Sequence, residues 1–98
     1  MADRQRSYDH GISATRLLND TIGGCLDKAA SRWPDREAVV VRDQNMRMTF
    51  ATLRQEADRL AAGLIALGLG PGDRVGLWSP NRIEWVLSQY ATAKAGLI

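Results

Sequence analysis

The chain is 98 residues long, with 45% hydrophobic residues, 24% charged residues and a formal net charge of +2 at pH 7. This length allows one small domain, and the composition is that of an ordinary globular protein. Acidic and basic residues alternate along the chain, whereas a nucleic-acid-binding surface shows a cluster of basic residues. No stretch approaches the roughly 18 consecutive apolar residues of a membrane-spanning helix. We therefore expect neither a nucleic-acid partner nor a transmembrane segment.

The beginning of the chain is polar and has no sustained hydrophobic period, so residues 1–20 are predicted to be a loosely ordered arm. His10 lies in this arm, and we interpret it as a solvated side chain. The arm has neither the apolar run nor the small-residue cleavage pattern of a secretory signal. The expected location is therefore the cytoplasm.

A helix is predicted from Thr21 to the residue before Pro34, because the residue preceding a proline disfavours the helical conformation. Asn19 and Asp20 are alternative caps for its first turn. Apolar side chains recur at helical spacing, at Ile22, Cys25, Leu26, Ala29 and Trp33. The single cysteine excludes a disulfide within the chain. Its place in this pattern predicts a buried and inert thiol.

A β-hairpin is predicted next. Residues 38–41 are a β-branched run, and residues 46–48 alternate between apolar and polar side chains. Between them, residues 43–45 have the composition of a turn in which Asn45 can adopt the left-handed conformation.

A second helix is predicted after Thr49, whose hydroxyl can cap it. Gly68 is predicted to end this helix as a left-handed residue, with Leu69 folding back on the last turn. The predicted apolar face comprises Phe50, Leu53, Ala57, Leu60, Ala61, Leu64 and Leu67.

The remaining residues predict a strand, a crossover helix and the opening of another strand. Gly70–Asp73 has turn composition, Arg74–Trp78 is predicted to be a buried strand, and Asn81 is a candidate helix cap. The apolar face of the last helix comprises Ile83, Val86, Leu87, Tyr90 and Ala91. Because a parallel pair needs both strands and a crossover between them, the pattern predicts an α/β protein with a truncated βαβ unit.

Chemical motifs are sparse. Gly68, Gly70 and Gly72 follow a helix and lead into a strand, which is the reverse of a phosphate-binding loop, so we interpret them as a structural turn.

Ser79 has neither the second glycine nor the nearby histidine of a nucleophile elbow, and it is predicted to hydrogen-bond the backbone. Because ligands bind at the carboxyl ends of strands in open sheets, the loop 79–81 lining a ligand cleft is the alternative.

The acidic and aromatic residues do not predict a catalytic or binding site. Glu56 and Glu84 are predicted to be solvated on helix surfaces, and no carboxylate pair suited to acid–base catalysis is apparent. Trp33 and Trp78 are core candidates, whereas Trp85 faces away from the apolar stripe of its helix, where it could meet a second layer of protein. We expect no catalytic, cofactor-binding or metal-binding residue in these 98 residues.

Several segments occur in a characteristic order and spacing. They are residues 21–23, 30–38 (ASRWPDREA), 49–53 (TFATL), 72–76 (GDRVG) and 79–85 (SPNRIEW). Together they resemble the N-terminal start of adenylate-forming, AMP-binding acyl-CoA synthetases, and the last segment resembles fatty-acyl-CoA synthetases. One departure is Thr52, which stands where members often carry the acid of a capping box.

The resemblance implies that residues 21–98 are an incomplete N-terminal subdomain of the large domain of such a synthetase. It implies ATP, magnesium and coenzyme A for the parent enzyme, a fatty acid as substrate, and the remainder of the synthetase as partner. The segments that carry the chemistry lie beyond Ile98. The chain alone is therefore expected to be inactive scaffold that binds no cofactor. Two alternatives stay open, a fragment of an adenylating enzyme that loads a carrier protein and a small stand-alone interaction module.

Overall fold

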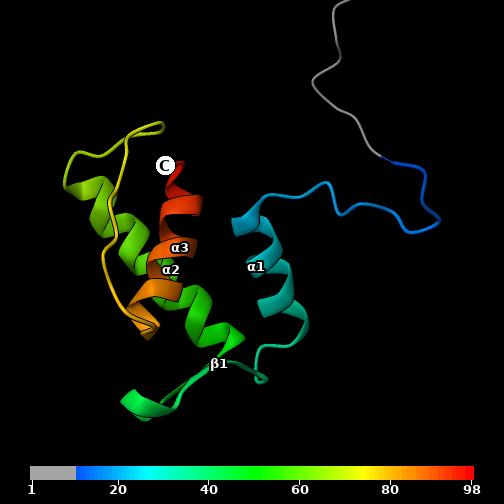
Figure 1. Ribbon diagram of the computed structural model, residues 1–98, viewed down its shortest axis with the longest axis horizontal. Helices are drawn as coiled ribbons and strands as arrows, with labels where there is room; N and C mark the ends of the chain where they lie inside the picture. Colours follow the sequence, from blue (N-terminus) through cyan, green and yellow to red (C-terminus); the bar gives the residue numbers. More distant parts are fainter. Residues whose placement is uncertain (1–10) are drawn as a thin grey trace, which may run out of the picture.

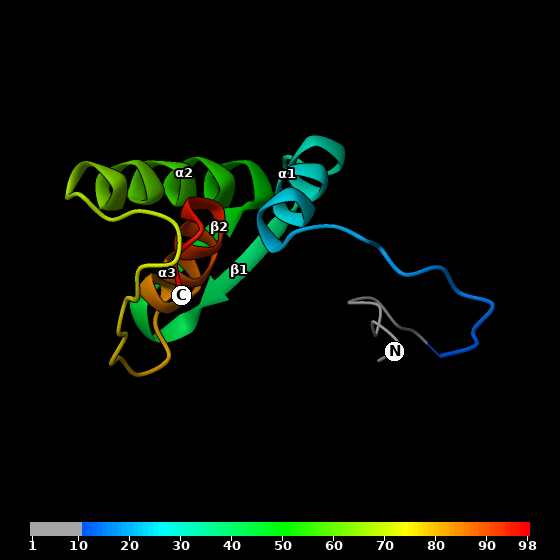
Figure 2. The same ribbon diagram turned by 90° about the horizontal axis from the view of Figure 1, so that it is seen from above.

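The computed structural model describes residues 11–98, and three helices carry most of the fold (Figure 1). Along the chain the elements are α1 (Ile22–Arg32), β1 (Glu37–Val41), a 3-10 turn (Arg42–Gln44), β2 (Met46–Thr49), α2 (Phe50–Ala66) and α3 (Ile83–Ala95). His10 and the first half of the predicted arm lie outside the described residues. Residues 11–20 form no helix or strand and are exposed. Figure 1 shows α1, α2 and α3 on one side of the β1–β2 hairpin, and Figure 2 shows the hairpin running between α1 and α3 when seen from above.

The cap of α1 differs from the prediction. Thr21 is the N-cap, and its Oγ1 accepts a hydrogen bond of 2.9 Å from the Gly24 amide. Asp20 instead accepts from the Thr21 amide at 2.8 Å and pairs with Lys28 at 2.9 Å. The prediction that Asn19 or Asp20 caps the helix is therefore wrong. The predicted end before Pro34 is confirmed, because α1 ends at Arg32.

The buried face of α1 is rotated from the predicted stripe. The buried residues are Gly23, Leu26 and Ala30, whereas Ile22 and Cys25 are exposed. The prediction of a buried thiol is therefore wrong. The physical reason is that α1 approaches α3 at Gly23, where the absence of a side chain permits close contact.

Trp33 is also more exposed than predicted. It retains 37% of its accessible surface and lies outside the buried core. The guanidinium carbons of Arg32 and Arg36 lie 4.7 and 5.7 Å from the centre of its ring. The ring therefore contacts two cations, a geometry within the range of cation–π attraction.

The predicted hairpin is confirmed. Strands β1 and β2 pair antiparallel, with Val39 opposite Met48 and Val41 opposite Met46. Asn45 has a φ of 52°, the left-handed conformation that its turn position requires.

Both ends of α2 are formed by local contacts, as predicted. The Thr49 Oγ1 accepts from the Thr52 amide at 3.2 Å. At the other end Gly68 has a φ of +97°, the Gly68 amide donates to the Ile65 carbonyl at 2.9 Å, and the Leu69 amide donates to the Leu64 carbonyl at 3.4 Å. These two bonds form a Schellman motif. The predicted apolar face stops before Leu67, which is exposed.

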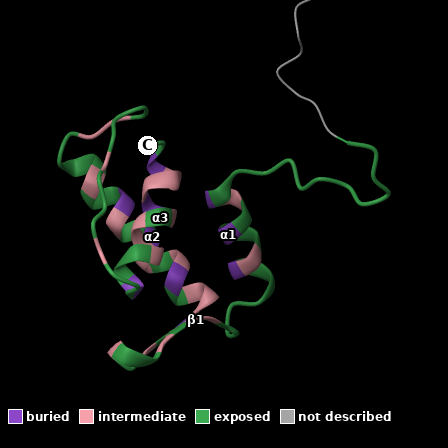
Figure 3. Cartoon of the chain, in the orientation of Figure 1, coloured by how far each residue is buried: buried purple, intermediate pink, exposed green. Residues whose placement is uncertain are grey.

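The core lies where α2 faces the other helices and the hairpin (Figure 3). One cluster comprises Leu26, Met48, Leu53, Ala57 and Ile83. A second cluster comprises Ala61, Ala91, Ala95 and Leu97. Long side chains dominate the first cluster, whereas small alanine side chains form most of the second, with Leu60 and Leu64 of α2 packed against them.

The predicted buried strand Arg74–Trp78 is not formed in the described residues. The segment is extended but is not assigned as a strand, and Trp78 is 101% exposed. Trp78 as a core residue is therefore also wrong for this chain. The physical reason is that a strand needs neighbours along its length, and among residues 11–98 only Ile98 hydrogen-bonds to the backbone of this segment.

Candidate functional site

The extended segment and the end of the chain begin a parallel pairing. The Ile98 amide donates to the Asp73 carbonyl at 2.8 Å, and the Val75 amide donates to the Ile98 carbonyl at 2.8 Å. Ile98 thus bonds to Asp73 and Val75, the two residues that flank Arg74. This is the hydrogen-bond pattern of a parallel ladder. The α/β fold class is therefore confirmed, with α3 as the crossover helix.

An apolar face lies beside this pairing. Leu77, Trp85 and Ile98, here called the open face, line a cleft of about 300 Å³ along α3. All three side chains are exposed, and Trp78 follows directly in sequence. An exposed apolar patch next to an unpaired strand edge is typical of a surface that contacts other protein. The arrangement agrees with the interpretation that Trp85 faces a second layer of protein.

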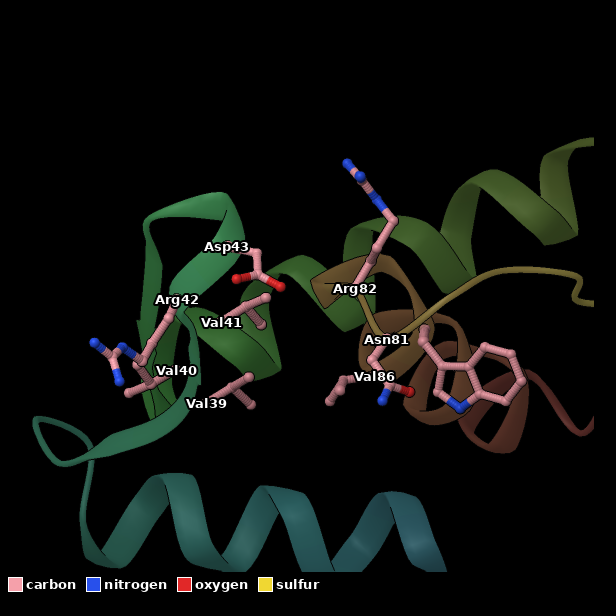
Figure 4. Close-up of a pocket in the computed structure, with 9 residues that line it drawn as sticks. Val39, Val40, Val41, Arg42, Asp43, Asn81, Arg82 and Val86 are labelled. Atoms are coloured by element: carbon pink, nitrogen blue, oxygen red, sulfur yellow. The ribbon is translucent and has the colours of Figure 1, made fainter.

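A second cleft, of about 380 Å³, lies between the hairpin and the start of α3 (Figure 4). Val39 and Val41 point from β1 toward Val86 on α3. Asn81 and Trp85 also line this cleft. Trp85 therefore borders both this cleft and the cleft of the open face. The loop 79–81 therefore contributes one residue to a cleft, while the Ser79 hydroxyl donates to the Pro80 carbonyl at 2.9 Å as predicted.

The start of α3 is capped by a residue from the hairpin turn. Gln44 Oε1 accepts from the Ile83 amide at 2.8 Å, and Gln44 Nε2 donates to the Glu84 carboxylate at 3.2 Å. The N-cap position is Arg82, which makes no capping bond with its side chain. The prediction that Asn81 caps this helix is therefore wrong. Local spacing gives no signal for Gln44, because the bond spans 39 residues.

Glu84 is exposed but belongs to this network. Its own backbone amide, the Gln44 side chain and Arg82 together hold the pKa of the Glu84 carboxyl below its ordinary value. Arg82 Nε donates to the carboxylate at 3.3 Å. The network joins the hairpin to the start of α3 and therefore fixes one wall of the second cleft.

Lys94 is the most enclosed charged side chain of α3, with 12% of its side chain exposed. Its Nζ lies 2.6 Å from Asp27 Oδ1 on α1 and 2.6 Å from Asp58 Oδ1 on α2. Burial lowers the pKa of Lys94, but the hydrogen bonds and charges of the two carboxylates outweigh it, and the pKa is raised. Lys94 therefore stays charged and joins three helices.

The raised pKa of Lys94 predicts a stability loss in strong alkali. Its contribution to stability is fully present below the unfolded value of 10.5 and is lost as the pH rises through the higher folded value. Urea unfolding from about pH 9 to about pH 11.5 should show this fall. At the lower pH, Lys94→Met should have a smaller free energy of unfolding than the unmodified chain. Between the two pH values, its free energy of unfolding should then fall by less than that of the unmodified chain. An identical alkaline fall in both proteins would contradict the prediction.

The glycine turn and the two lysines in the described part of the chain are engaged in contacts within the chain. The turn after Gly68 is closed on itself, because the Asp73 carboxylate accepts from the Gly70 amide at 2.7 Å. Lys28 and Lys94 are both engaged in ion pairs. Among residues 11–98 no group of three or more histidine, cysteine or acidic side chains is placed to hold a metal.

In the same part of the chain, no helix combines the length and the apolar character needed to cross a lipid bilayer.

An extended segment, a covering helix and a first parallel contact define the start of an α/β sheet unit of a larger fold. A family model described as AMP-binding enzyme matches residues 26–98. The chain belongs to the AMP-binding enzyme family, as the sequence resemblance implied.

The curated relatives include acyl-CoA ligases. The mitochondrial medium-chain acyl-CoA ligase ACSF2 of Mus musculus is 51% identical over 92 residues, which cover 94% of this chain and 15% of the relative. The putative acyl-CoA synthetase YngI of Bacillus subtilis is 43% identical over 82 residues, 84% of this chain and 15% of that protein. The chain thus spans about 15% of the length of these relatives.

The solved structures agree with the fold. A fatty acyl CoA synthetase of Mycobacterium tuberculosis superimposes with a TM-score of 0.76 at 38% identity, over 80% of this chain and 16% of that one. The prediction of an N-terminal segment similar to fatty-acyl-CoA synthetases is therefore confirmed.

Proposed function

We propose that the chain is the N-terminal part of an ATP-dependent ligase that joins a fatty acid to coenzyme A. The observation that carries the proposal is the 51% identity to a medium-chain acyl-CoA ligase over 94% of the chain. In this reaction the carboxylate attacks the α-phosphate of ATP, giving an acyl-adenylate and pyrophosphate. The thiol of coenzyme A then displaces AMP. ATP, magnesium and coenzyme A belong to the whole enzyme under this proposal.

The role proposed for these residues is scaffold. The open face and the unpaired edge of residues 74–78 would receive the next strands and helices of the large domain. Adenylation needs positive charge arranged in advance around the triphosphate, and the ion pairs of Lys28 and Lys94 leave neither lysine available for it. The residues therefore position a sheet and do not themselves carry the chemistry.

Loading of a carrier protein is the second candidate. A fused adenylation–PCP di-domain of Klebsiella oxytoca has a TM-score of 0.74 but is only 26% identical over 80% of this chain. The greater identity to acyl-CoA ligases favours coenzyme A as acceptor. A stand-alone interaction module is less well supported, because Leu77 and Trp78 remain uncovered.

A chimera tests the proposal. Residues 21–98 replace the matching segment of the mouse ligase, and pyrophosphate release and acyl-CoA formation are measured with a medium-chain acid. We expect both activities in the chimera and neither in the 98-residue chain alone. A folded chimera that loads only a carrier protein would favour the second candidate. Pyrophosphate release by the chain alone would overturn the scaffold role.

The proposed division into an arm, residues 1–20, and a subdomain, residues 21–98, predicts where a protease cuts first. Arg16 lies in the exposed stretch before α1. Exposed segments without secondary structure are cleaved before packed helices. Trypsin should therefore cut after Arg16 before it cuts after Arg32 or Arg54, as mass spectrometry of early time points would show. Earlier cleavage within α1 or α2 would contradict this division.

We propose a cytoplasmic location for the protein. The animal relatives are mitochondrial by name, so the mitochondrion is the alternative outcome. Fractionation of cells that produce the full-length protein distinguishes the two.

A further inference from the structure

Lys94 is held at both ends of its side chain. At the ammonium end, Asp27 and Asp58 each lie 2.6 Å away. At the stem, a Cβ placed on Gly23 would lie 2.7 Å from Lys94 Cγ and 3.6 Å from Lys94 Cα. The stem therefore lies directly against the backbone of α1. Lys94 has little freedom to move along or away from that helix.

The end of α3 contributes small side chains to its contact with α2. In the second core cluster, the buried residues of these two helices are Ala61, Ala91 and Ala95, and Leu60 and Leu64 of α2 pack against them. Helices lock against one another when ridges of side chains enter grooves, and alanine methyl groups form only shallow ridges. Deeper contacts are made by Ile83 at the start of α3 and by Leu53 on α2. At the end of α3, the ion pairs of Lys94 add a restraint along the helix axis.

The chain between Lys94 and the parallel pairing is short and well restrained. Gly96 has a φ of 74° and its carbonyl accepts from the Gly72 amide at 2.9 Å. The Leu97 amide donates to the Thr92 carbonyl at 2.9 Å, and the Leu97 side chain is buried. A shift of α3 along its axis would therefore be passed on to Ile98.

We propose that Lys94, seated on Gly23 and held by Asp27 and Asp58, is a positioning residue for the parallel sheet. It sets the position of Gly96–Ile98 along residues 72–75, and with it the register of the pairing. Lys94 touches no reacting group in this role. The inference goes beyond the proposed function and stands independently of it, because it concerns backbone pairing and not catalysis.

Amide hydrogen exchange of the 98-residue chain tests the proposal. Lys94→Met keeps the stem and removes the charge. We expect the amides of Gly72 and Val75, which donate to Gly96 and Ile98, to exchange about tenfold faster, because local opening has its own free energy. Amides in the middle of α2, such as that of Ala57, should be accelerated much less. Equal acceleration at all these sites, or none at Gly72 and Val75, would overturn the proposal.

Matched variants separate positioning from loss of a charge. Glu56→Gln breaks an exposed ion pair with Arg59 on α2 and should leave Gly72 and Val75 unchanged. Lys94→Arg retains the positive charge and should restore at least part of the protection. Asp58→Asn removes one of the two carboxylates and should give an intermediate rate, which provides the test if Lys94→Met does not fold. Protection unchanged in Asp58→Asn would then overturn the proposal.

Discussion

Trp85→Ala is expected to destabilise the assembled enzyme far more than the isolated chain. In the chain, Trp85 is 40% exposed and borders two open clefts, so its loss should cost about 1 kcal/mol. If the remainder of the synthetase covers the open face, the same side chain becomes buried. Truncation of a buried tryptophan to alanine costs about 3–5 kcal/mol. Urea unfolding of the chain and of the chimera with the mouse ligase gives the two values.

Trp33→Ala is the matched control for this experiment. Trp33 has nearly the same exposure, 37%, but it lies at the end of α1 between Arg32 and Arg36 and lines neither cleft of Trp85. Its replacement should cost a similar amount in the chain and in the chimera. Equal costs for Trp85 in both proteins would show that the open face is not covered by the rest of the enzyme.

The features predicted correctly from sequence depend on contacts within a few residues. Thr49 caps α2 through an amide three positions later, and Gly68 ends the same helix through two backbone bonds. Asn45 closes the hairpin in the left-handed conformation. In each case the chemistry of one side chain, or its absence, determines the local backbone.

The incorrect predictions concern contacts between segments far apart in the sequence. The cap of α3 comes from Gln44, and the partners of Lys94 lie 67 and 36 residues away. The exposure of Cys25 follows from the approach of α1 to α3 at Gly23. Periodicity indicates that a helix has an apolar face, but the partner helix decides which residues of that face are covered.

Predictions about the candidate site differ in the same way: those that depend on local geometry are correct, and those that depend on distant segments are wrong. The prediction that Trp85 lies off the apolar stripe of its helix is correct, because its angular position follows from helical geometry. The prediction that Trp78 is a core residue is wrong, because an apolar run predicts a buried strand only where neighbouring strands are present. The strand propensity of residues 74–78 is therefore a property of the sequence that these 98 residues do not realise.

The same substitution, glycine to alanine, is expected to have opposite effects at Gly23 and Gly63. Both residues lie inside helices, where alanine is favoured by about 1 kcal/mol. At Gly63 an added Cβ meets nothing within 4 Å, so Gly63→Ala should raise the free energy of unfolding by about that amount. At Gly23 the added Cβ would lie 2.7 Å from Lys94 Cγ.

Overpacking of this kind costs about 1–3 kcal/mol, and Lys94 cannot move aside without lengthening its bonds to Asp27 and Asp58. After the helix-propensity gain of about 1 kcal/mol is subtracted, the net effect of Gly23→Ala should be a loss of up to about 2 kcal/mol. A small domain shifts its melting temperature by about 4–8 °C for each kcal/mol. Thermal unfolding followed by circular dichroism should therefore separate the melting temperatures of the two variants by about 4–24 °C.

A double variant identifies the contact responsible. In Gly23→Ala with Lys94→Ala, the long stem is gone, and the added methyl group has room. Gly23→Ala should then act as Gly63→Ala does and raise stability by about 1 kcal/mol relative to Lys94→Ala alone. The difference between the two backgrounds measures the coupling between the residues. A stabilising Gly23→Ala in the unmodified chain would show that the Lys94 stem yields freely, and that the close approach of α1 to α3 imposes no restraint.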